Sequence, residues 1–211
     1  MDATAHISNL IDVSLCLVAL FISVRSFDIY KRIRYRRLFI LGLSMALISL
    51  SAAADFSRDY VKMIAPGLGW FVYMAQAFGF LFIFLSLLRS SNAYLKFVML
   101  LSVLSVLPLL ALLFLSSILP GIPNDLTLAL LESVRWVISF AIFFAYFIAL
   151  ASKSMHFNRF MAAAFFFISL GNFMSMLQSF NPILELPLLT NLGDITSIFG
   201  VVALIIAVAW N

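Results

Sequence analysis

The sequence predicts an all-α integral membrane protein, a bundle of seven transmembrane helices that forms a single domain over residues 1–211. Hydrophobic residues make up 64% of the chain and charged residues only 10%, whereas a soluble domain is about half apolar and a quarter charged. The apolar residues also gather in seven long runs, which short gaps separate. Both observations indicate a chain whose helices lie in the lipid bilayer.

Each apolar run is close to the length that one membrane-crossing helix needs. That length is about 20 residues, because the bilayer offers no water to bond the backbone and a helix bonds its own N–H groups. The predicted spans are 7–24, 38–55, 68–88, 97–118, 129–151, 160–179 and 194–210. Prolines lie in the gaps at 66, 120, 123, 182 and 187, where helices are expected to end.

The basic residues predict the direction of the spans. Ten of the thirteen lie in the first, third and fifth gaps or at their edges, namely Arg25, Lys31, Arg32, Arg34, Arg36, Arg37, Arg89, Lys96, Lys153 and Arg159. Short cytoplasmic loops of membrane proteins are enriched in Lys and Arg. We therefore expect an outside N-terminus, a cytoplasmic C-terminus and a multi-pass protein of the cell membrane. Because the positive charge is confined to short loops, no nucleic-acid partner is expected.

The acidic residues follow the opposite pattern. Eight of the nine lie at or near the predicted outer face, and only Asp28 lies on the cytoplasmic side. Three basic residues break the pattern: Arg58 and Lys62 lie in an outer loop, and Arg135 lies within the span 129–151.

Polar residues inside the spans are the best guide to a site, because they are costly in lipid and tend to face the bundle interior. Glu132, Arg135 and Ser139 share one face of the fifth span, and Ser169, Asn172 and Ser179 share a stripe of the sixth. Most such residues lie in the predicted outer half. We expect an outward-facing polar pocket or buried network rather than a pore, formed by Arg135, Glu132, Asp194, Asp12, Asp55, Asn172 and Gln76.

Two of these residues have alternative interpretations. Arg135 is either an anion-binding or charge-relay group, or one half of a structural ion pair with Glu132 one turn away. Asp194 follows Gly193 and so matches the last two residues of the Gly-x-Gly-Asp motif of intramembrane aspartyl proteases. We favour a helix N-cap for Asp194, since a carboxylate there accepts bonds from free N–H groups.

The densest charge cluster, Lys31, Arg32, Arg34, Arg36 and Arg37, forms a candidate cytoplasmic patch. Such a patch sets the orientation of the chain and contacts anionic lipid headgroups at about 1 kcal/mol per basic residue. The alternative is a docking surface for a cytoplasmic effector.

No sequence pattern points to a catalytic residue, a metal site or a cofactor. His6 and His156 lie at opposite membrane faces, which excludes a shared haem, and Cys16 is the only cysteine. Retinal-binding seven-helix proteins need a lysine in the seventh span, and residues 194–210 contain none.

The sequence therefore predicts a non-enzymatic membrane protein, either a sensor or receptor-like module or an accessory subunit that binds other membrane proteins. The first alternative is a small transporter or channel with a 3+1+3 helix repeat. Arg37 and Arg159 precede the second and sixth spans, and Leu68-Gly69 and Leu192-Gly193 lie near the start of the third and seventh. An intramembrane enzyme is the third possibility.

Overall fold

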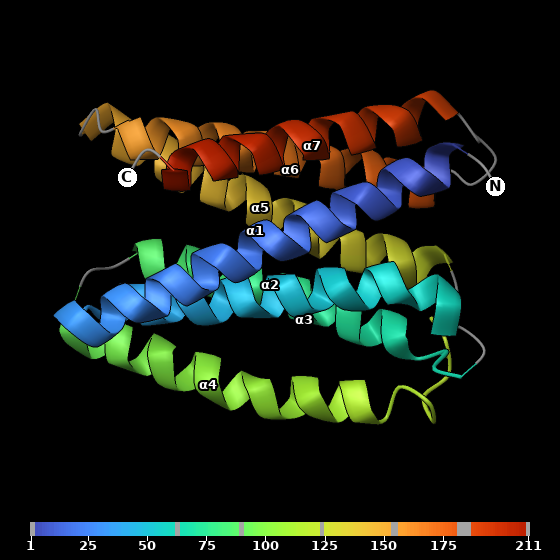
Figure 1. The fold of residues 1–211 in the computed structure, drawn as a ribbon, viewed down its shortest axis with the longest axis horizontal. Helices are drawn as coiled ribbons and strands as arrows, with labels where there is room; N and C mark the ends of the chain where they lie inside the picture. The colour runs from blue at the N-terminus through green and yellow to red at the C-terminus, as the bar shows by residue number, and fades with distance from the viewer. Residues whose placement is uncertain are drawn as a thin grey trace. The chain divides into compact units, whose positions relative to one another are not determined.

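The fold is entirely helical. The computed structural model describes residues 3–61, 64–88, 91–122, 125–152, 156–180 and 187–209. These residues form seven α-helices and no strand (Figure 1). The helices are α1 (Ala3–Ile33), α2 (Arg36–Val61), α3 (Leu68–Leu88), α4 (Asn92–Phe114), α5 (Asp125–Ser152), α6 (His156–Phe180) and α7 (Pro187–Ala209). The predicted all-α architecture of seven helices is confirmed.

Six of the helices are long and apolar enough to cross a membrane. Their apolar parts are Val13–Ile33, Arg36–Arg58, Leu68–Leu88, Asn92–Phe114, Leu126–Leu150 and Asn158–Phe180. In α7 the apolar stretch that the structure describes, Ile195–Ala207, is shorter. By helix length and composition, this architecture is compatible with a polytopic membrane protein.

Several helices extend beyond the predicted spans, because charged residues at their ends continue the helix. α1 runs on to Ile33 and carries Lys31 and Arg32 in its last turn, where cations interact favourably with the helix dipole. The next residue, Arg34, has a positive φ of 55°, and its N–H donates to the Tyr30 carbonyl at 2.8 Å. This bond closes the helix with a left-handed capping residue, a position that usually holds glycine.

The starts of α4 and α7 correct two predictions. α4 begins at Asn92 rather than at 97, because the Ser91 hydroxyl caps it by accepting the Tyr94 N–H at 3.3 Å. α7 begins at Pro187. Proline suits the first helical position, because a backbone N–H at that position has no partner inside the helix and proline has no N–H. Asp194 therefore lies inside α7, and the N-cap prediction for it is wrong. Likewise, Leu68 opens α3 whereas Leu192 lies well inside α7.

The chain divides into two compact units, which we describe separately. The α1–α4 unit comprises Leu15–Ile122, and the α5–α7 unit comprises Pro123–Asn211 together with Met1–Ser14. In the α1–α4 unit, the core joins α2, α3 and α4 through the buried side chains of Leu47, Ala54, Leu68, Phe71, Val72, Ala75 and Leu109. A second cluster contains Ile40, Phe82, Leu95 and Val98. α1 packs on α2 through Phe27, whose ring lies 5.5 Å from that of Phe39.

Both ends of the α1–α4 unit are tied by loop contacts. At one end, Arg36 Nη1 donates to Asn92 Oδ1 at 2.7 Å and so joins the start of α2 to the start of α4. At the other end, Trp70 Nε1 donates to the Pro120 carbonyl at 3.1 Å. The basic α1–α2 and α3–α4 connections therefore lie at the same end of this unit, as the positive-inside rule requires. Which side of a membrane that end faces stays a prediction.

In the α5–α7 unit, α6 packs against both α5 and α7 (Figure 1). The approach of α6 to α7 is close enough to require glycine. A Cβ atom built on Gly171 would clash with the Ser197 hydroxyl and lie 3.1 Å from the Gly193 carbonyl oxygen. Small residues allow helix backbones to approach in this way in membrane proteins. Gly171 therefore allows the close packing of α6 on α7.

Candidate functional site

α5 and α6 meet in an antiparallel register that repeats every seven residues. Contacts pair residues that step forward by seven along α5 and backward by seven along α6: Glu132 with Ser179, Ser139 with Asn172, and Tyr146 with Phe165. A seven-residue repeat keeps the same two helix faces in contact over successive turns. The face of each helix that carries polar residues is therefore held against its counterpart.

The polar side chains on these faces form two neighbouring sets of interhelical hydrogen bonds, which we call the α5–α6 polar network: Arg135 with Asn172 and Ser139, and Glu132 with Ser179. Arg135 Nη2 donates to Asn172 Oδ1 at 2.8 Å, and Asn172 Nδ2 donates to Ser139 Oγ at 3.3 Å. The Ser179 hydroxyl donates to Glu132 Oε2 at 2.6 Å. The amide group of Asn172 on α6 thus links the Arg135 guanidinium to the Ser139 hydroxyl, both of which lie on α5.

The network buries most of its polar groups. Glu132 is 7% exposed, Asn172 8% and Ser139 fully buried. A charged side chain at the centre of a membrane helix costs about 2.5–3.5 kcal/mol. Each interhelical hydrogen bond contributes about 0.6 kcal/mol on average, up to about 1.7 kcal/mol. Because Glu132 and Arg135 bring opposite charges one turn apart, the network has no formal net charge, which lowers the cost of its burial.

The α5–α6 contact changes from polar to aromatic along its length. The polar bonds lie toward the start of α5 and the end of α6, the ends that the positive-inside rule places outside. Trp136 and Phe173 add an aromatic contact of 5.1 Å beside these bonds. Beyond Ser139 the described contacts are aromatic: Phe143 lies 5.4 Å from Phe166, and Tyr146 stacks on Phe165 at 5.9 Å. The polar residues thus stop near the middle of the helix pair.

The structure brings together three of the seven residues predicted to form the outer pocket: Glu132, Arg135 and Asn172. Asp55 instead pairs with Arg58 Nη1 at 3.1 Å on α2, which explains a basic residue in a predicted outer loop. Gln76 is buried in α3, so both Asp55 and Gln76 belong to the α1–α4 unit. The side chains of Asp12 and Asp194 lie outside the described part of the chain.

Ser139 and Ser179 join the site although the predicted pocket omitted them. Each lies on the polar stripe recognised in its own helix, which was the available signal. What single helices do not reveal is that these stripes face each other across α5 and α6.

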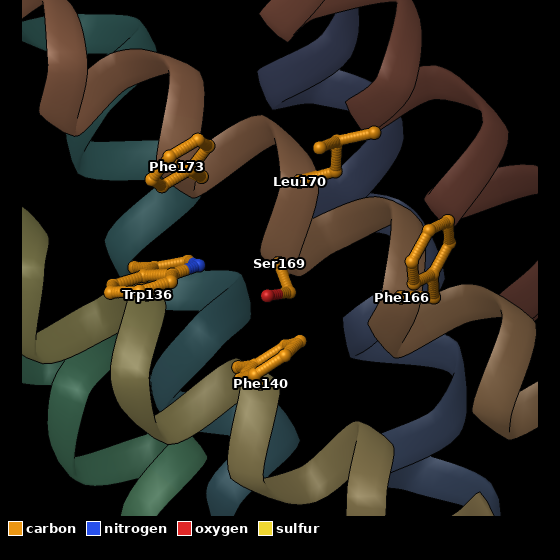
Figure 2. A pocket seen from close by; sticks show the side chains of 6 residues that line it. All are labelled: Trp136, Phe140, Phe166, Ser169, Leu170 and Phe173. Atoms are coloured by element: carbon orange, nitrogen blue, oxygen red, sulfur yellow. The ribbon is translucent and has the colours of Figure 1, made fainter.

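An apolar groove adjoins the network on the same helix pair. Trp136 and Phe140 of α5 and Phe166, Ser169, Leu170 and Phe173 of α6 line it (Figure 2). Its volume is about 170 Å³. No signal in the sequence separated these aromatic residues from the other lipid-facing phenylalanines.

The predicted cytoplasmic patch is partly engaged in contacts within the chain. Arg32 Nη2 pairs with Asp28 Oδ2 at 2.9 Å, and both side chains are exposed. Arg36 binds Asn92. Lys31 and Arg34 are exposed and so carry the positive charge most available to a lipid headgroup or an effector.

The α5–α6 polar network places hydrogen-bonding groups and charged side chains between two helices. Among the described residues, no three His, Cys, Asp or Glu side chains lie close enough together to hold a metal ion. The polar network can bind a small polar or anionic group or fix the helices in one register. No protein-family model matches the chain, and no curated protein or solved structure shows significant similarity to it.

Proposed function

We propose that this chain is a non-enzymatic polytopic membrane protein that presents the α5–α6 polar network toward the outside. It acts as a receptor-like module or as an accessory subunit of a membrane complex. The observation that supports this proposal is the change from polar to aromatic contacts along α5 and α6. A polar network that stops near the middle of the membrane offers polar groups on one side of it and does not form a continuous polar path across it.

The lining of the inner half argues against a transport route along this helix pair. The contacts of Tyr146 with Phe165 and of Phe143 with Phe166 fill it with rings. A solute that followed the network inward would have to separate these rings and lose its own hydration, which costs polar groups several kcal/mol.

A small transporter with a 3+1+3 repeat is the second candidate. The basic residues before α2 and α6 favour it, since Arg37 and Arg159 lie in the first turns of these helices. The pairs Leu68-Gly69 and Leu192-Gly193 do not favour a repeat, because the first opens α3 and the second lies well inside α7.

Reconstitution into vesicles separates the two candidates. Vesicles loaded with a mixture of inorganic ions, amino acids and sugars are prepared with and without the purified protein, and the released solutes are measured by mass spectrometry. We expect the same release from both preparations.

Release that rises in proportion to the amount of protein would contradict the proposal. Asn172→Leu serves as the site variant, because it removes the centre of the network. Ser175→Ala is its control, since the bond that the structure describes for the Ser175 hydroxyl goes to the Gly171 carbonyl one turn back on the same helix. Release lost in Asn172→Leu and kept in Ser175→Ala would identify the network as part of a transport path.

A further inference from the structure

The apolar groove between α5 and α6 has one hydroxyl group in its lining. Its walls are the rings of Trp136, Phe140, Phe166 and Phe173 with the Leu170 side chain, and Ser169 is the sixth lining residue. No charged side chain lines the groove. A charged ligand would therefore lose its hydration without gaining a partner.

The Ser169 hydroxyl is positioned for a ligand rather than for the protein. Ser169 is only 2% exposed, and among the residues that the structure describes its hydroxyl forms no identified hydrogen bond. Figure 2 shows this oxygen pointing from α6 into the space beside Trp136 and Phe140. By contrast, Ser133, Ser139 and Ser175 of this helix pair bond backbone carbonyls of their own helix, and Ser179 bonds Glu132. A ligand oxygen in the groove can form a hydrogen bond with this hydroxyl, so an oxygen-bearing occupant has a specific advantage here.

The groove lies in the middle of both helices and borders an exposed apolar stripe. On α5 that stripe includes Val137, Phe140 and Phe144, which are 55%, 37% and 46% exposed. In a membrane this stripe faces lipid, since apolar surface of this extent is not left in water. A molecule dissolved in the bilayer can thus reach the groove sideways, without passing through water.

We propose that this groove binds a lipid-soluble ligand through one six-membered ring that bears a hydroxyl or carbonyl oxygen. The volume of about 170 Å³ compares with the roughly 150 Å³ of a cavity that holds benzene. The aromatic walls favour a ring, because ring pairs gain from their geometry beyond the area they bury. The Ser169 hydroxyl binds the oxygen. This site is independent of the proposed outward-facing function.

Two brominated probes test the proposal on the full chain in lipid nanodiscs. Trp70→Phe and Trp210→Phe leave Trp136 as the sole tryptophan of the three, so its fluorescence reports on the groove. Bromine quenches that fluorescence on contact. The probes are 4-bromophenol and bromobenzene, which differ in the hydroxyl, and their concentrations are expressed as mole fractions in the bilayer to correct for partitioning.

We expect saturable quenching by both probes, with 4-bromophenol bound about tenfold more tightly because of one hydrogen bond. Ser169→Ala is expected to remove that tenfold difference, and Ser169→Thr, which keeps the hydroxyl, to retain it. Ser175→Ala, a serine of the same helix outside the groove, is the matched control. The helix content and thermal transition of each variant establish that it is folded.

Three results would overturn the proposal. The first is quenching that rises linearly with mole fraction for both probes, which is what simple dissolution in lipid gives. The second is a preference for 4-bromophenol that survives Ser169→Ala. The third is strong quenching by phospholipids brominated in their acyl chains that 4-bromophenol does not displace, since the groove would then hold a lipid chain.

Discussion

At the scale of single residues, Asn172 determines how the polar stripes of α5 and α6 are joined. Its amide oxygen accepts from Arg135 and its amide nitrogen donates to Ser139. The sequence identified Asn172 and Arg135 as site residues because both are polar within apolar spans. It could not identify their pairing, since Glu132 was the only partner that spacing along one helix guaranteed. The distance between two helices is not encoded in the spacing along either one.

The first prediction concerns Asn172→Leu. This change removes the bonds that Arg135 and Ser139 make to the Asn172 amide, and an interhelical hydrogen bond of this kind contributes about 0.6 kcal/mol on average, up to about 1.7 kcal/mol. We expect the free energy of unfolding in mixed micelles to fall by that amount, measured by denaturant titration of helix content. Ser175→Ala, which removes only a bond within α6, should change it much less. Equal effects of the two variants would show that the network is not a stabilising unit.

The second prediction concerns Arg34, whose φ of 55° is a left-handed conformation that favours glycine. Side chains disfavour this region by about 1–2 kcal/mol. We expect Arg34→Gly to raise the free energy of unfolding by about 1 kcal/mol, measured in the same titration. Arg32→Gly is the control, because Arg32 lies inside the last turn of α1, where glycine is destabilising. Destabilisation by both changes would contradict the capping role of Arg34.

At the scale of helices, the sequence predicted how many there are better than where they end. Apolar runs are set by the thickness of the bilayer and can be read directly. Helix ends depend on local bonds such as the Ser91 hydroxyl with the Tyr94 N–H, and on charged turns such as Lys31 and Arg32 that extend beyond the apolar run. For α7 we predicted a start at Asp194, because the long apolar run begins there. The helix itself begins earlier, at Pro187.

The third prediction concerns the packing of α6 on α7. Gly171→Ala adds a methyl group where the Ser197 hydroxyl and the Gly193 backbone leave no space, and overpacking of this kind costs about 1–3 kcal/mol. We expect a lower thermal transition in micelles. Gly121→Ala is the matched control, because a Cβ there would meet only the Pro66 carbonyl oxygen at 3.5 Å, an ordinary contact. A transition that falls equally in both variants would show that the loss of glycine, not the close approach, is responsible.

At the scale of the whole molecule, orientation remains a prediction from the basic loops. Within the α1–α4 unit, the bond between Arg36 and Asn92 places two basic connections at one end, as that prediction requires. The apparent exception Arg58 is paired with Asp55, so the outer loop carries less net positive charge than a count of basic residues suggests. Composition could predict the helical, membrane-span-like class of the protein, while the side of each loop stays a prediction. It could not predict the polar network, which depends on the register of two helices.

The central claim is that the α5–α6 polar network lies at the outer side of the membrane. It is tested most directly by cysteine labelling in a Cys16→Ala background, which removes the only natural cysteine. Ser179→Cys places a thiol at the network, and Arg159→Cys places one near the opposite end of the same helix. A membrane-impermeant maleimide is added to intact cells and then to permeabilised cells. We predict that Ser179→Cys reacts in intact cells and that Arg159→Cys reacts only after permeabilisation. Labelling of Arg159→Cys in intact cells, with Ser179→Cys reacting only after permeabilisation, would contradict the claim.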